Sequence, residues 1–341
     1  MLVSVYVPFV VTALLAVLGP RYSRRLPPRS AAWALACAAL VTAVGWVGVL
    51  ALLAFTGVAQ VPQIAAEGRW SVAALRAEDP VYRVVAAASA LVLVVCVVSL
   101  GVAAIRQIRD IVWARRECAL LPGETELAVV DDDAPLAFAL PGAPGRIVVS
   151  RAMLRCLGDG EREALLEHER AHLRSRHHLF QGVWRLTAAL NPLLRPLVVA
   201  GGYVLERWAD EEAAGRVGDR RVVAHAVGRA ALASAGASQP AALAATGGAV
   251  PQRVRALLSP PPVNRSLPFV VGGLLLAACC ASVANAASDS DRMMDNAKWA
   301  QCAAYAETAG APLAGEHRHR PGFCREGYER RSHREPRSEP K

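Results

Sequence analysis

The sequence contains almost no lysine, few aromatic residues and no C-x-x-C pair. Lys298 and Lys341 are its only lysines, so arginine supplies nearly all of the positive charge behind the net charge of +9. Basic and aromatic residues are not interleaved and no nucleic-acid-binding motif occurs, so we expect no direct binding to nucleic acid. We interpret the charge instead as the arginine excess that membrane proteins carry on their cytoplasmic side.

Long apolar runs are abundant, and hydrophobic residues make up 54% of the 341 residues. Four runs are long enough to cross a bilayer: residues 2–19, 31–58, 82–104 and 268–287. The first run lacks a basic N-terminal region and an evident cleavage site, so we expect a membrane helix there and not a signal peptide. The sequence therefore predicts a mainly α polytopic membrane protein with four transmembrane helices.

Arginine placement predicts the orientation, because basic segments tend to stay in the cytoplasm. Arginines lie in the loop between the first two runs, after the third run and before the fourth. They are Arg21, Arg24, Arg25, Arg29, Arg106, Arg109, Arg115, Arg116, Arg253, Arg255 and Arg265. We expect three transmembrane helices with short loops in residues 1–105 and a cytoplasmic domain in residues 106–266. A fourth transmembrane helix should follow in residues 267–287, then a largely disordered extracytoplasmic tail in residues 288–341, with the N-terminus also outside.

The expected cytoplasmic domain begins with β structure and continues as helices. Residues 126–130, 136–140 and 146–150 have the composition of short strands and are separated by turn residues. The strand at 146–150 is either an edge strand that pairs with an extended peptide substrate or an ordinary core strand. Residues 186–205 are apolar but contain Asn191 and Pro192. They are either a fifth membrane span or, as we prefer, a helix that lies against the membrane or within the domain.

The most informative motif is His168-Glu169-Arg170-Ala171-His172, an H-E-x-x-H sequence. Residues 162–176 contain no glycine or proline, which favours a helix, and residues four apart in a helix lie on the same face. His168 and His172 can therefore bind one Zn²⁺, and Glu169 can act as the general base of a metallopeptidase. We predict one zinc ion per chain.

A catalytic zinc ion usually has three protein ligands, so a third ligand is needed beyond the motif. Glu206 is the best candidate, and Asp210, four residues later, could hydrogen-bond a ligating imidazole. The alternative for Glu206 is a solvated acidic helix face. His177 and His178 lie off the ligand face of a helix that carries His172, so we expect surface or packing roles for both.

The cysteines of the tail form the only candidate pair in a polar segment. If the tail is extracytoplasmic, Cys302 and Cys324 lie in an oxidising compartment, which predicts a disulfide between them. The alternative is two free thiols.

These motifs resemble those of the BlaR/MecR-type membrane metallopeptidases. The resemblance rests on residues 166–174, 190–193 and 206–210, and on 253–258 before a proline run and the last apolar run. It implies an α+β gluzincin protease domain between spans three and four of a bacterial cell-membrane protein. It also implies proteolysis of a cytoplasmic winged-helix repressor of the BlaI/MecI type in signal transduction.

Two alternatives remain beside this resemblance. Residues 206–210 also resemble the CAAX-prenyl-protease and HtpX-like group, which would imply quality control of membrane proteins. A non-catalytic membrane receptor or scaffold that keeps the zinc fold is the other alternative. The polar tail carries no recognisable penicillin-binding sensor domain, so we do not expect direct β-lactam sensing.

Overall fold

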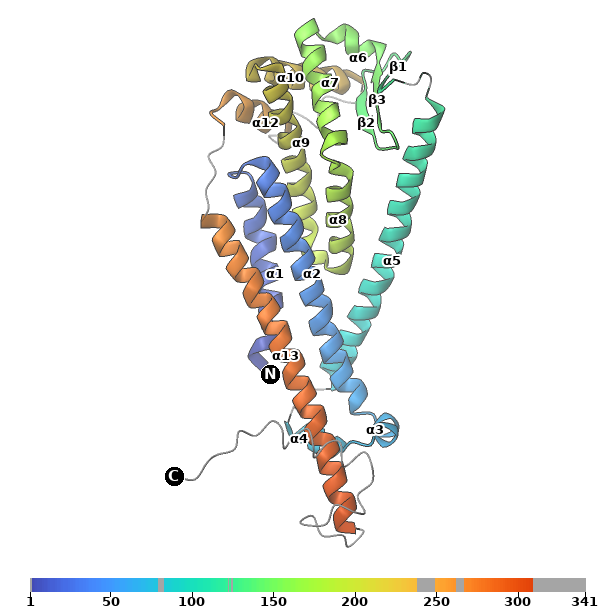
Figure 1. Ribbon diagram of the computed structural model, residues 1–341, viewed down its shortest axis with the longest axis vertical. Helices are drawn as coiled ribbons and strands as arrows, with labels where there is room; N and C mark the ends of the chain where they lie inside the picture. The colour runs from blue at the N-terminus through green and yellow to red at the C-terminus, as the bar shows by residue number, and fades with distance from the viewer. Residues whose placement is uncertain are drawn as a thin grey trace. The chain divides into compact units, whose positions relative to one another are not determined.

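The computed structural model describes residues 2–78, 83–121, 123, 125–237, 249–261 and 267–308, and these are mainly helical (Figure 1). Four helices contain an apolar window long enough to cross a membrane. They are α1 (Leu2–Ser23), α2 (Pro28–Ala59), α5 (Arg83–Leu120) and α13 (Leu267–Thr308). Each contains the described residues of one of the four predicted spans, so the prediction of a mainly α chain with four candidate spans is confirmed.

The chain forms two compact units, and the first combines residues within 1–9, 44–95 and 277–308. It includes the short helices α3 (Pro62–Gly68) and α4 (Val72–Glu78), which lie between α2 and α5 in the sequence. The indole of Trp70 donates a hydrogen bond to the carbonyl of Ala59, and Ser71 N–H donates to the carbonyl of Ala297. Ala59, Leu75, Met293 and Ala297 form a small buried cluster there. This packing stabilises the C-terminal part of α13, around Met293 and Ala297.

The expected disordered tail is the clearest difference from the sequence prediction. Residues 288–308 continue α13 as a helix, because Met293 and Ala297 pack against α4 and the end of α2. Cys302 is disulfide-bonded, and its predicted partner Cys324 lies outside the described residues. The proposed pairing of these two cysteines stays a prediction.

The second unit combines residues 10–43 and 96–276 and contains a three-stranded sheet. Its strands are β1 (Leu127–Val130), β2 (Ala137–Leu140) and β3 (Arg146–Ser150), in the order β1-β3-β2. β3 pairs parallel with β1 and antiparallel with β2, and every residue of β3 is buried. The three predicted strands are confirmed, but residues 146–150 form the central strand, so the edge-strand alternative for them is wrong.

Six α-helices follow the sheet among the described residues of this unit. They are α6 (Arg151–Cys156), α7 (Asp159–Arg174), α8 (His177–Leu190), α9 (Arg195–Val217), α10 (Arg220–Ala237) and α12 (Ala249–Leu258). The hydroxyl of the buried Ser150 accepts a hydrogen bond from Met153 N–H and begins α6. α7 contacts both the sheet and α9, so it lies between them (Figure 1).

Helices α8 and α9 form a hairpin, because the apolar segment 186–205 is broken at Asn191. A 3₁₀ turn, η1 (Pro192–Leu194), joins the two helices, and the Asn191 carboxamide accepts a hydrogen bond from Leu193 N–H. The same side chain is fully buried and donates to the hydroxyl of Thr12 in α1. A large buried cluster joins the hairpin to α1 and α2. The segment is therefore two packed helices, not a fifth continuous span.

Candidate metal centre

Helix α7 places the two motif histidines next to each other, as their spacing predicts. The Nε2 atoms of His168 and His172 lie 3.2 Å apart. Two nitrogens bound at 2.0–2.1 Å to a tetrahedral zinc ion would lie about 3.3 Å apart. The pair therefore already has the separation that a shared zinc ion requires.

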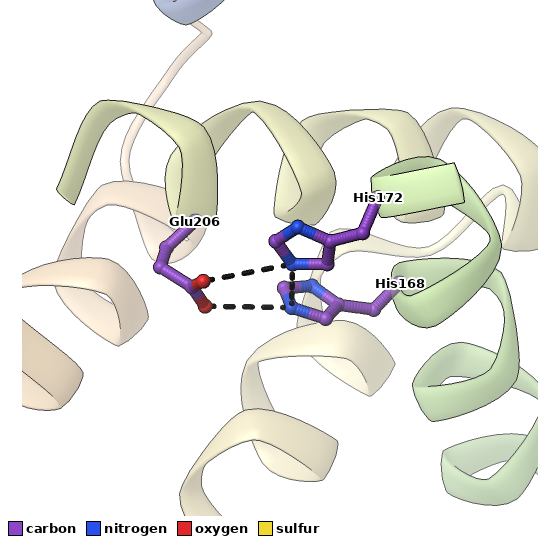
Figure 2. A group of neighbouring side chains, drawn as sticks. All are labelled: His168, His172 and Glu206. Atoms are coloured by element: carbon purple, nitrogen blue, oxygen red, sulfur yellow. Dashed lines mark hydrogen bonds and ion pairs between the residues drawn. The ribbon is translucent and has the colours of Figure 1, made fainter. Parts of the chain in front are cut away.

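Glu206 reaches the same point from α9, which packs along α7 (Figure 2). Its two carboxylate oxygens lie 3.5 Å from His168 Nε2 and 3.5 Å from His172 Nε2. One donor atom from each of the three residues lies within 4.8 Å of the others. Two imidazole nitrogens and one carboxylate are the donor set of many catalytic zinc sites, so these residues fit the metal.

Asp210 lies one helical turn beyond Glu206 and faces the opposite side of the His168 ring. Its Oδ1 is 3.1 Å from His168 Nδ1, and the side chain is almost fully buried. When the His168 ring is neutral, a carboxylate in this place keeps its one proton on Nδ1 and leaves Nε2 free for a metal.

Arg253 of α12 is a site residue that the motif analysis did not single out. Its guanidinium makes two bonds to the Asp210 carboxylate, from Nε at 2.8 Å and from Nη2 at 2.7 Å. Its Nη1 lies 2.8 Å from Glu206 Oε2. Arg253 therefore orients both acidic residues of α9. It is far from them in the sequence, and no local spacing indicates the contact.

His177 is the second residue whose position the sequence analysis did not predict. Its Nδ1 lies 2.9 Å from His172 Nδ1, and its side chain is only 1% exposed. The prediction assumed one continuous helix. In the structure α7 ends at Arg174, and Arg176 adopts a left-handed conformation with φ of 50°. The chain turns there, so His177 is brought back over His172, whereas His178 is only half-buried.

Residues 104–240 match the model of peptidase family M48. The matched segment includes His168, Glu169, His172 and Glu206. Comparison with curated proteins finds no match, and comparison with solved structures finds none either.

The M48 match supports a metallopeptidase of a membrane type. Peptidases of this family depend on a metal, and a group of two histidines and one glutamate that could hold a metal ion is present here. Together with the four apolar helices, the match is consistent with a multi-pass membrane protein.

Glu169, the expected general base, lies beside the candidate metal ligands and near β2. It is 8% exposed, and burial raises the pKa of its carboxyl group above the ordinary value. The backbone N–H of Ala139 in β2 approaches the carboxylate and partly offsets this effect. A carboxylate with a raised pKa is better matched to proton transfer near neutral pH.

The charges of the centre are unevenly distributed over its histidines. Burial disfavours a proton on His168, but the contacts with Asp210 and Glu206 outweigh it and raise the pKa to about 10. Burial and the charge of His168 lower the pKa of His172 to about 4. Burial and the neighbouring His172 lower the pKa of His177 to about 3. At neutral pH the His168 ring therefore carries a second proton and a positive charge, whereas the His172 and His177 rings are neutral.

The acidic residues of the centre are ionised in this environment. Burial opposes ionisation of Glu206, but the hydrogen bond and charge of His168 and the charge of Arg253 lower its pKa. The pKa of Asp210 is lowered in the same way, chiefly by its bonds to Arg253.

A small cavity of about 190 Å³ opens beside the centre. His168, Glu169, Glu206 and Arg253 form one part of its wall. Small aliphatic side chains form most of the rest, largely from α10, where Val223, Ala226, Val227, Ala230 and Ala231 contribute. The cavity can receive an apolar side chain next to the reacting groups.

Proposed function

We propose that this protein is a membrane-embedded zinc endopeptidase that cleaves a cytoplasmic protein. The observation that carries the proposal is the convergence of His168, His172 and Glu206, with the two imidazole Nε2 atoms 3.2 Å apart. Glu169 lies beside these residues, on the same helix as the two histidines. This arrangement has the two parts of a metallopeptidase centre, a metal-binding group and an adjacent general base.

Each residue of the centre has a separate task in this proposal. His168, His172 and Glu206 would hold a zinc ion, which when bound would polarise the scissile carbonyl and acidify a water molecule. Glu169 accepts the proton of the attacking water and passes it to the leaving amine. Asp210 and Arg253 fix the orientations of His168 and Glu206 through the contacts described above.

The substrate backbone is expected to pair with β2. Ser150 N–H donates to the carbonyl of Leu136, and this register turns the backbone groups of Ala137 and Ala139 away from β3. Ala139 faces Glu169, and Ala137 lines the cavity. An extended peptide added to this free edge would pass directly beside the general base. The edge-strand role that we considered for residues 146–150 is therefore proposed for 137–140.

The segment of α9 that carries Glu206 contacts the loop between α1 and α2. Arg207, next to Glu206, donates a hydrogen bond from Nη1 to the carbonyl of Arg24 at 2.8 Å. Arg24 lies over the ring of Tyr203, and Arg29 lies over the ring of Trp208. This loop is arginine-rich, which favours a cytoplasmic location for both the loop and the centre. The geometry thus supports access to cytoplasmic substrates.

By its resemblance to the BlaR/MecR type, the favoured substrate is a winged-helix repressor of the BlaI/MecI type, cleaved in signal transduction. A second candidate is HtpX-like quality control of membrane proteins. The packing of α8 and α9 against α1 and α2 favours it, because that packing brings the centre to the boundary of the apolar helices. In that case the substrates would be unfolded membrane proteins.

The test is a proteome-wide map of new protein N-termini in the native host, comparing the wild type with Glu169→Gln under cell-envelope stress. One Glu169-dependent cut in a DNA-binding protein supports the signalling protease. Many cuts in membrane proteins support quality control. A Glu169→Gln strain with no lost terminus and a full cellular phenotype would support a non-catalytic scaffold and overturn the proposal.

A further inference from the structure

A second, larger cavity lies beside the α8–α9 hairpin. It has a volume of about 510 Å³ and lies between α5 on one side and the hairpin on the other. None of the metal-centre residues lines it. We call it the α5 groove. The proposed peptidase activity has no use for it, so it requires an explanation of its own.

The α5 groove is lined by basic side chains. Arg106 of α5, Arg185 of α8 and Arg195 of α9 line it, and Asp110 is the only acidic residue in its wall. Within the described part of the chain, none of these three guanidinium groups makes a hydrogen bond or an ion pair with the protein. Three cations that line one groove without protein partners favour binding of an anion.

The rest of the groove is apolar and continues along a candidate membrane span. Val98 and Val102 of α5 line it and are 60% and 43% exposed. Arg106 lies one helical turn beyond Val102, near the point where the apolar run of α5 ends. The groove therefore combines apolar side chains of a candidate membrane span with three arginines.

We propose that the α5 groove binds one phospholipid with an anionic headgroup. The phosphate and its neighbouring anionic group would contact Arg106, Arg185 and Arg195, and an acyl chain would lie along Val98 and Val102. Basic pockets between membrane helices bind anionic lipid headgroups in this way. A free anion would leave the apolar wall unused, which is why we commit to a lipid. The inference does not depend on the peptidase activity.

The experiment uses the full chain, equilibrated with vesicles of equal parts phosphatidylcholine and phosphatidylglycerol and then purified in mild detergent. Mass spectrometry counts the lipids that stay bound. The test variant carries Arg106→Gln, Arg185→Gln and Arg195→Gln. A control with the same charge change carries Arg155→Gln, Arg216→Gln and Arg221→Gln, at exposed positions away from the groove. A third variant, Ala189→Trp, fills the groove without a change of charge.

Wild type and control are expected to retain phosphatidylglycerol in preference to phosphatidylcholine. Each arginine lost from the groove should weaken retention about fivefold, the equivalent of about 1 kcal/mol, and the triple variant on the order of a hundredfold. Ala189→Trp should also lose the lipid, and it keeps the test decisive if the triple variant fails to fold. Equal retention by all variants, equal loss in the control, or displacement of the lipid by inorganic phosphate alone would overturn the proposal.

Discussion

Replacement of His177 by leucine is expected to weaken zinc binding without weakening the metal-free fold. His172 and His177 are both neutral, so only one of them donates in their Nδ1–Nδ1 hydrogen bond at 2.9 Å. If His172 uses Nε2 as a metal ligand, its proton must be on Nδ1, and His177 must accept it. His177 therefore selects the tautomer of His172 that can bind zinc.

The magnitude follows from this role. Loss of a hydrogen-bond partner of a metal ligand typically costs 10–100-fold in affinity, equivalent to about 1.4–2.7 kcal/mol. The fold itself should change little, because loss of the His172–His177 hydrogen bond is offset by removal of His177 Nε2, which is buried without a hydrogen-bond partner among the described residues. His177→Leu should therefore raise the zinc Kd while the thermal unfolding midpoint of the metal-free protein stays the same or rises.

The assay is competition for zinc between the purified full chain and a chelator of known affinity. His177→Asn is the matched variant, because its Oδ1 can take the place of the ring Nδ1 as an acceptor, and it should stay within about threefold of the wild type. His178→Leu is the control for the neighbouring position. Wild-type zinc affinity in His177→Leu, or an equal loss in His178→Leu, would refute the reasoning.

Three further predictions concern the centre and its support. Zinc affinity should rise by about tenfold for each pH unit near neutrality, because the metal must displace the second proton of His168, whose pKa is about 10. Calorimetry in two buffers should detect release of about one proton on zinc binding at pH 7. A zinc affinity that does not change with pH would contradict this prediction. Arg253→Met removes both guanidinium bonds of the buried Asp210 carboxylate, which keeps only its contact with His168, and should destabilise the fold by about 3–5 kcal/mol, seen as a lower thermal unfolding midpoint in detergent. An unchanged midpoint would show that the Arg253–Asp210 pair contributes nothing. Ser150→Ala removes the hydroxyl that caps α6 through Met153 N–H and should cost about 1–2 kcal/mol in the same assay, whereas Ser150→Thr should recover part of the loss.

The part of the site that depends on helical periodicity could be predicted from the sequence. His168 and His172 are four residues apart on one helix, and Glu206 and Asp210 repeat the same spacing on a second helix. Only the pairing of the two helices had to be assumed, and the structure places all four side chains together.

The parts that depend on a local break or on distant contacts could not be predicted in this way. His177 joins the centre because α7 ends at Arg174, although neither glycine nor proline marks the end. Arg253 joins it through α12, which comes late in the chain and packs on α9 and α10. The continuation of α13 beyond residue 287 depends likewise on burial of Met293 and Ala297 against other elements.

The metal content of the purified full chain tests the central claim most directly. Elemental analysis of the wild type, Glu169→Gln, and the double variant His172→Ala with Glu206→Gln would be combined with a peptide-cleavage assay. We predict one zinc ion per chain in the wild type and in Glu169→Gln, none in the double variant, and cleavage by the wild type alone. A wild type without zinc, a double variant that retains it, or cleavage by Glu169→Gln at the wild-type rate would contradict the account.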